Sequence, residues 1–143
     1  MLTVTRVCLS LLGVSIIAIG GMMAVIGPST TANFLGDILS AVFGSKAYSG
    51  GFEHTNADSE MRVLAVFFAA YGAVLLWLST RLESHKEWVY GAIALYFAGG
   101  VTRLLSYASV GWPDALFLLL MAFELGAPII IAVIFTFGLR AQR

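Results

Sequence analysis

The chain has 143 residues, of which 59% are hydrophobic and only 11% are charged. A soluble domain of this length carries far more charge, so the composition excludes a water-soluble globular protein and indicates a membrane protein. Eight basic and eight acidic residues cancel, which argues against nucleic-acid binding, because that function needs a basic surface. The single cysteine, Cys8, excludes an intrachain disulfide and a cysteine zinc site.

Four apolar stretches are long enough to cross a bilayer as helices, namely residues 7–27, 61–80, 88–108 and 115–139. About 20 helical residues span the roughly 30 Å hydrocarbon core. None of the stretches shows the alternation of a barrel strand. The first is longer than the apolar region of a signal peptide, so we interpret it as a retained span. We therefore predict an all-α membrane protein, with residues 1–143 forming a single bundle of four transmembrane helices.

The connection over residues 28–60 is the longest segment between two spans. Its first part, up to Phe43, has apolar residues at helical spacing after a Pro28-Ser29-Thr30 start, which predicts a side-chain cap and a short amphipathic helix. This helix would either cover the bundle as a lid or only fill space by packing against it. Residues 45–59 are polar and predict a loop. Three possible metal ligands lie in that loop, but their spacing matches no metal-binding motif, so we expect no metal site. They are Glu53, His54 and Asp58.

Basic residues in the flanks of the spans predict the orientation, because Lys and Arg favour the cytoplasmic side. Lys46 and Arg62 fall on one side of the membrane. A larger set falls on the other side, and it consists of Arg6, Arg81, Lys86, Arg140 and Arg143. We expect a protein of the bacterial inner membrane with both termini in the cytoplasm and residues 28–60 outside.

Two ionisable residues lie inside predicted spans, Arg103 in the third and Glu124 in the fourth. Such residues are costly in lipid and need a partner or a purpose. Their predicted depths differ by about one helical turn, so the two side chains should meet. Three interpretations remain open: a structural ion pair, a ligand-binding site, or proton transfer through Glu124. Pro128 leaves the backbone carbonyl of Glu124 without its usual donor and predicts a bend there.

Further polar groups share the environment of this pair. One face of the third span carries Tyr96, Gly99, Gly100, Arg103, Ser106 and Tyr107, and we predict that this face points inward. Glu60 and Arg62 mark the outer mouth of the second span, either as boundary charges or as part of a vestibule. Small residues such as Gly20, Ala65 and Ala69 favour close helix packing. The predicted ligand-binding set is Glu60, Arg62, Arg103, Tyr107 and Glu124.

Several landmarks occur in a fixed order along the chain: Pro28, Glu60-Met61-Arg62, Gly99 to Leu104, Gly111-Trp112-Pro113 and Glu124. In these the chain resembles the bacterial membrane proteins of domain-of-unknown-function family 4345. More distantly, its size and four-span plan look like the small quinone-associated DoxX-type proteins. The resemblance implies the four-helix plan and brings no established reaction.

Catalytic machinery is not evident in the sequence. No span contains histidine, and neither a nucleophile with a base nor a glycine-rich phosphate loop appears. We therefore expect no catalytic residues and no cofactor, and we predict an accessory subunit or an amphiphile-binding module with an outward-facing polar pocket. Its partners would be membrane lipids and either a larger membrane complex or further copies of the chain. The alternatives are a transporter or proton-coupled subunit that uses Glu124, and a quinone-associated redox subunit.

Overall fold

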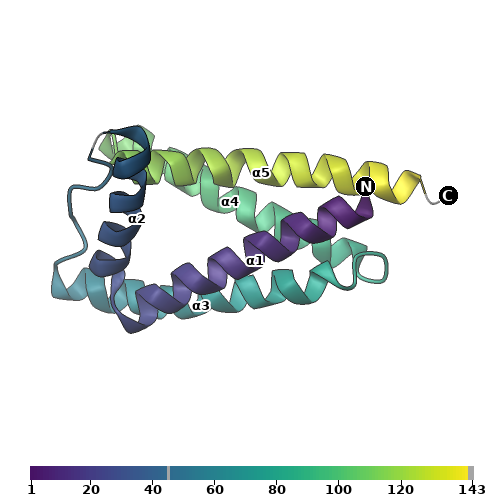
Figure 1. The fold of residues 1–143 in the computed structure, drawn as a ribbon, viewed down its shortest axis with the longest axis horizontal. Helices are drawn as coiled ribbons and strands as arrows, with labels where there is room; N and C mark the ends of the chain where they lie inside the picture. The colour runs from purple at the N-terminus through teal and green to yellow at the C-terminus, as the bar shows by residue number, and fades with distance from the viewer. Residues whose placement is uncertain (45, 142–143) are drawn as a thin grey trace.

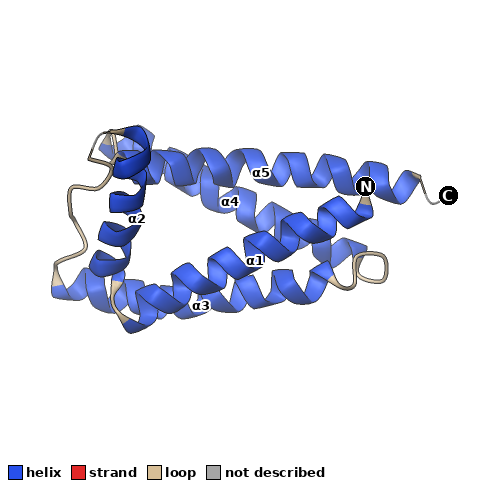
Figure 2. Cartoon of the chain, in the orientation of Figure 1, coloured by secondary structure: helices blue, strands red, loops and turns tan. Residues whose placement is uncertain are grey.

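The computed structural model describes residues 1–44 and 46–141, and these form five helices joined by short connections (Figure 1, Figure 2). The helices are α1 (Leu2–Val25), α2 (Pro28–Phe43), α3 (Thr55–Ser79), α4 (Lys86–Val110) and α5 (Ala115–Arg140). Within the described residues, all except α2 are long and apolar enough to span a membrane. The predicted fold class is confirmed, including the short helix between the first two spans. Arg143, which was used to predict the orientation, lies outside the described residues.

Helix α3 begins at Thr55, six residues earlier than the predicted start of the second span. The His54 ring precedes it as a cap, because His54 Nδ1 accepts a hydrogen bond from the backbone N–H of Asn56 at 3.3 Å. Asp58 lies in the first turn, where the helix dipole favours a negative charge. The prediction of a loop through residue 59 was therefore wrong for residues 55–59.

The junction between α1 and α2 depends on Gly27 and Pro28. Gly27 has a φ of +98°, which glycine adopts without steric cost, and Pro28 occupies the first turn of α2, where its missing N–H does no harm. The predicted side-chain cap at this start was wrong, because Gly27 is the capping residue and no side-chain cap bond forms. The chain therefore leaves α1 and turns sharply into α2 (Figure 1).

The four long helices form two antiparallel pairs, α1 with α3 and α4 with α5 (Figure 1). The pairs meet at the end where α1 begins and α5 ends, and there Leu2 lies against Gly138. Buried apolar side chains from all four helices form the core there, among them Leu9, Leu75, Val89 and Phe135. Toward the other end the pairs diverge, and α2 lies across the gap (Figure 1). A second, smaller core of Ala32, Tyr48 and Leu116 lies under α2.

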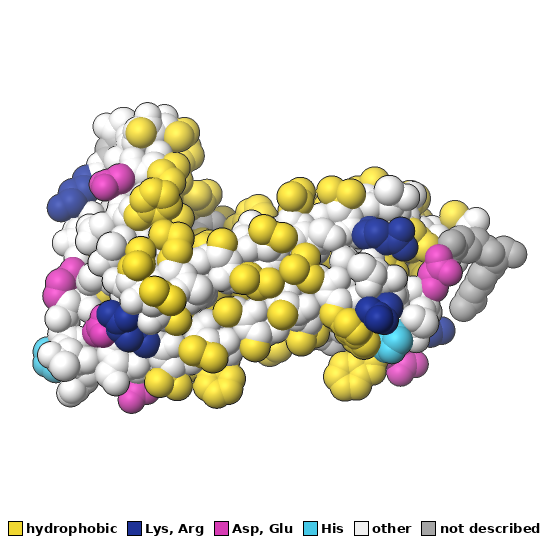
Figure 3. All heavy atoms as spheres, turned by 60° about the horizontal axis from the view of Figure 1, so that its bottom comes forward, with side chains coloured by type: hydrophobic (Ala, Val, Ile, Leu, Met, Phe, Trp, Pro, Cys, Tyr) yellow, Lys and Arg dark blue, Asp and Glu magenta, His cyan; other side chains and the backbone are white. Residues whose placement is uncertain are grey.

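The surface has the charge distribution of a membrane protein. Figure 3 shows hydrophobic side chains over the middle of one face, with charged side chains gathered toward both ends. Many large apolar residues of the long helices are exposed, including Leu11, Phe67, Leu95 and Phe123. Such a belt suits lipid rather than water.

Candidate functional site

A cavity of about 920 Å³ lies between the two helix pairs, in the region where they diverge. Side chains from all five helices line it, and most of them are apolar. Along α5 its wall extends from Leu116 to Ile131, which is about 22 Å at the helical rise. The cavity is therefore elongated and runs from the helix α2 end toward the core at the termini end.

Glycines let the two helices of each pair pack closely against each other. The open volume therefore lies between the pairs and not within them. In the first pair a side chain on Gly13 would lie 2.8 Å from the Gly72 carbonyl oxygen, and one on Gly72 would lie 2.7 Å from the Gly13 carbonyl oxygen. Gly20 lies equally close to Ala65 and Ala69 of α3, as predicted for small residues. In the second pair Gly100 lies against Leu125 and the backbone of Glu124.

The predicted contact between Arg103 and Glu124 is confirmed. Arg103 Nε donates a hydrogen bond to Glu124 Oε2 at 2.7 Å, and both residues line the cavity. The Glu124 side chain is only 7% exposed, whereas that of Arg103 is 37% exposed. Because Gly100 lets the backbone of α5 approach closely at Glu124, the carboxylate is held against α4 at the level of Arg103.

The rest of the Arg103 guanidinium faces an apolar neighbour and the cavity. Its Cζ atom lies 5.9 Å from the centre of the Phe117 ring, within the range of a cation–π contact. Among the described residues, its only hydrogen bond is the one from Nε to Glu124. The two terminal nitrogens of the guanidinium are therefore available to a molecule in the cavity.

Tyr96 lies on the same face of α4 as Arg103, seven residues earlier, and also lines the cavity. Its side chain is 8% exposed and stacks on Tyr71, with ring centres 6.3 Å apart. Its hydroxyl makes no hydrogen bond to the described residues, whereas the Tyr71 hydroxyl donates to the Ala92 carbonyl at 2.7 Å. Tyr96 was missing from the predicted ligand set, although its spacing from Arg103 placed it on the inward face.

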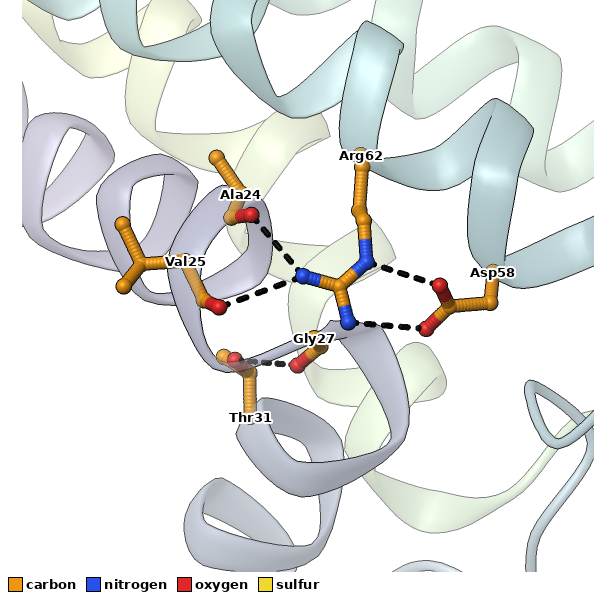
Figure 4. A network of polar contacts seen from close by, with 6 residues as sticks. All are labelled: Ala24, Val25, Gly27, Thr31, Asp58 and Arg62. Atoms are coloured by element: carbon orange, nitrogen blue, oxygen red, sulfur yellow. Dashed lines mark hydrogen bonds and ion pairs between the residues drawn. The ribbon is translucent and has the colours of Figure 1, made fainter.

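Arg62 has a different role, which Figure 4 shows. Its Nε and Nη2 donate to the Asp58 carboxylate at 2.7 and 3.3 Å, and its Nη1 donates to the carbonyls of Ala24 and Val25 at 3.0 and 3.2 Å. It thereby joins the start of α3 to the last turn of α1. Arg62 is not among the residues that line the cavity.

Glu60 and Tyr107 also lie outside the cavity lining. Glu60 is exposed, and the Tyr107 ring packs edge-on against Trp112 with centres 5.0 Å apart. Of the five residues in the predicted ligand-binding set, the structure brings Arg103 and Glu124 together at the cavity and leaves three elsewhere. The predicted grouping of Glu60 and Arg62 with this pair fails because Arg62 is held by Asp58 and α1.

The segment that follows α2 folds back under it and closes one end of the cavity, where Phe52 forms part of the wall. Asp114 holds this segment by accepting hydrogen bonds from the Ser49 backbone N–H and hydroxyl at 2.7 to 2.9 Å. Burial raises the pKa of the Tyr48 hydroxyl. The pKa of Glu53 is lowered, mainly because the Gly51 N–H donates to its carboxylate at 2.6 Å.

Helix α5 continues through Pro128, which is buried. Because proline has no N–H, the Glu124 carbonyl lacks the donor that an uninterrupted helix would supply four residues later. The carbonyl oxygen of Glu124 is therefore a second polar acceptor in α5, beside the carboxylate of the same residue.

No curated protein and no solved structure matches the chain, and the distant likeness to DoxX-type proteins stays a hypothesis. A family sequence profile matches residues 4–135, a range that includes every landmark from Pro28 to Glu124. The chain therefore belongs to the family described as Domain of unknown function (DUF4345).

Proposed function

We propose that this protein binds an amphiphile, a membrane lipid or another long-chain molecule, in the cavity between its two helix pairs. The observation that carries the proposal is an apolar cavity of about 920 Å³ whose wall contains one ion pair. Ligand sites have volumes of this order, with mostly apolar walls and a few polar groups that orient the ligand.

The cavity is partly open rather than enclosed, so molecules of the surrounding membrane can occupy it. Water is a poor filler between apolar walls, whereas hydrocarbon chains are abundant in a bilayer. A long-chain molecule is therefore the best-matched occupant.

The cavity is accessible from the lipid side. Leu11 of α1 and both Phe123 and Ile130 of α5 line it, and they are 64%, 55% and 59% exposed. These exposed fractions support a lateral opening between α1 and α5. A ligand would then enter from the bilayer without crossing the helix α2 end.

The orientation follows from the charge pattern, as part of the same proposal. Both described chain ends lie at one end of the bundle (Figure 1), and the flanks at that end carry Arg6, Arg81, Lys86 and Arg140. Under the positive-inside rule this end faces the cytoplasm of the bacterial inner membrane. The protein would act there as a binding module or as an accessory subunit of a larger membrane complex.

The test is to purify the protein in a mild detergent and to identify bound long-chain molecules by native mass spectrometry. Ala127 lines the cavity on α5, so Ala127→Phe should fill part of it and lower ligand occupancy. Ala122→Phe is the matched control, because Ala122 is exposed on the same helix outside the cavity lining. Wild-type protein without any bound amphiphile, or equal occupancy in the two variants, would refute the proposal.

A second candidate function is proton transfer through Glu124. The observation that favours it is a 7% exposed carboxylate next to a backbone carbonyl that Pro128 deprives of its donor. Proton flux in proteoliposomes should then require Glu124 and be lost in Glu124→Gln. Flux that survives this change, or no flux in the wild type, would rule it out.

A further inference from the structure

The polar groups in the cavity wall include hydrogen-bond donors that have no partner among the described residues. The Arg103–Glu124 contact uses one of the five guanidinium N–H groups, and the Tyr96 hydroxyl makes no hydrogen bond within the described residues. Tyr96 lines the cavity and is more than nine-tenths buried as a residue, and its hydroxyl oxygen keeps some accessible surface, so it can donate a hydrogen bond to an occupant. The wall therefore suits a ligand oxygen that accepts hydrogen bonds.

The charge at this point of the wall is already balanced. Glu124 Oε2 lies 2.7 Å from Arg103 Nε, so the guanidinium has its counter-ion. An anionic ligand attracted by Arg103 would be repelled by Glu124 at nearly the same distance. It would also lose its water without gaining a net charge interaction. An uncharged acceptor gains the hydrogen bonds and does not bring a second charge.

The depth of the pair points to the same kind of ligand. Arg103 lies seven residues before the end of α4 and Glu124 nine residues after the start of α5, which places them about 10–14 Å from the helix α2 end. The lining is apolar on both sides of the pair, with Leu35 and Phe117 toward α2 and Leu12 and Ile131 toward the termini. A charged headgroup would have to leave the membrane interface to reach this depth.

We infer that the cavity takes an uncharged long-chain molecule with one or more carbonyl or ester oxygens, which accept hydrogen bonds from Arg103 or from Tyr96. Glu124 is a positioning residue, because its carboxylate holds the guanidinium in place. This inference rests on the proposed function and specifies the chemistry of its ligand. Quinones, glycerides and wax esters share that chemistry.

The test compares four probes with the same eighteen-carbon chain: methyl oleate, octadecene, oleyl sulfate and oleyl trimethylammonium. Purified protein in detergent is incubated with equal concentrations of each probe, and occupancy is measured by native mass spectrometry. We expect methyl oleate to bind about tenfold more tightly than the other three, as expected for about one net hydrogen bond. If octadecene or a charged probe binds as tightly, the inference is overturned and the proposed function stands. If no probe binds, the proposed function itself fails.

Two variants test the donors. Tyr96→Phe should reduce the preference for methyl oleate over octadecene several-fold and leave octadecene binding unchanged. Tyr90→Phe is the matched control, because Tyr90 is on the same helix and its hydroxyl contacts Thr136 at 2.7 Å, outside the cavity lining. The double change Arg103→Leu with Glu124→Leu should abolish the preference. An undiminished preference in Tyr96→Phe or in the double variant would contradict the assignment.

Discussion

The two helix pairs are both antiparallel, yet different contacts hold them together. In the α1/α3 pair, glycines bring the two backbones together at two levels, Gly13 with Gly72 and Gly20 with Ala65. In the α4/α5 pair, Gly100 brings α5 close to α4 at Glu124, and an ion pair inside the span joins the two helices.

Two arginines fasten the two ends of the α1/α3 pair, each by donating to backbone carbonyls at the end of the partner helix. Arg6 at the start of α1 donates to the Ser79 carbonyl at the end of α3 at 3.0 Å. Arg62 at the start of α3 donates to the last carbonyls of α1. Each arginine therefore satisfies carbonyls that the end of the partner helix leaves without intrahelical donors.

The two pairs also differ in where their charged side chains lie relative to the cavity. The α1/α3 pair has its arginines at the boundaries of its apolar stretches and small residues at the interface, which leaves no space between its two helices. The α4/α5 pair places its arginine inside the span, next to the cavity. A charge at that position is expensive unless it has a use. The charged groups of the proposed binding site therefore come from the second pair, whereas both pairs contribute its apolar wall.

The largest effect is expected when the ion pair is broken from one side. Glu124→Leu leaves Arg103 without its counter-ion and should lower the free energy of unfolding by about 3 kcal/mol. Adding Arg103→Leu should restore most of that loss, because two apolar side chains replace the pair. Chemical unfolding in detergent micelles measures both values. A double variant as unstable as the single one would show that shape, and not charge, holds α4 to α5.

The backbone contact in the α1/α3 pair should be somewhat less sensitive. Gly72→Ala places a Cβ atom 2.7 Å from the Gly13 carbonyl oxygen, and the resulting overpacking should cost about 2 kcal/mol. Gly21→Ala is the control, because a Cβ atom at Gly21 meets nothing within 4 Å. Equal stability of the two variants in thermal unfolding would mean that the close approach is not required.

A smaller effect is expected at the end of the same pair. Arg62→Lys keeps the charge but loses the planar fork that joins Asp58 to the carbonyls of Ala24 and Val25. The unfolding temperature should fall by less than in Gly72→Ala, and hydrogen exchange should accelerate in the last turn of α1. An unchanged rate of hydrogen exchange in the last turn of α1 would show that Arg62 does not stabilise that turn.

The smallest effect is expected in the segment between α2 and α3, which closes the cavity at the end near α2. The pKa of Glu53 lies below its ordinary value of 4.5, chiefly because the Gly51 N–H donates to the carboxylate. The carboxylate therefore stabilises the fold above about pH 4.5, and this contribution is lost as the pH falls through the lowered pKa. An NMR titration should place the Glu53 midpoint below 4.5, and Glu53→Gln should remove the accompanying change at Gly51. A midpoint at or above 4.5 would contradict the hydrogen bond.

Much of the architecture could be predicted from composition and spacing. The apolar stretches give the four spans because lipid offers no partner for backbone N–H and C=O groups, which forces each span into a helix. The depths of Arg103 and Glu124 follow from the helical rise alone, so their contact could be predicted as well. The start of α3 could not be predicted in this way, because the ring of His54 caps the helix several residues before its apolar stretch begins.

The order of the side chains is enough to identify the four segments that can span a membrane, and to predict that an arginine and an acid meet between two of them. Both follow from local rules, namely the solvent preference of side chains and the period of the helix. The packing of the two helix pairs is what makes Arg62 fasten α1 to α3 and Arg103 face a cavity, although each arginine lies seven residues from the end of its helix that is nearer to α2. The reason is that a cavity is the space between surfaces, and its place depends on how the two pairs diverge, which no local pattern records.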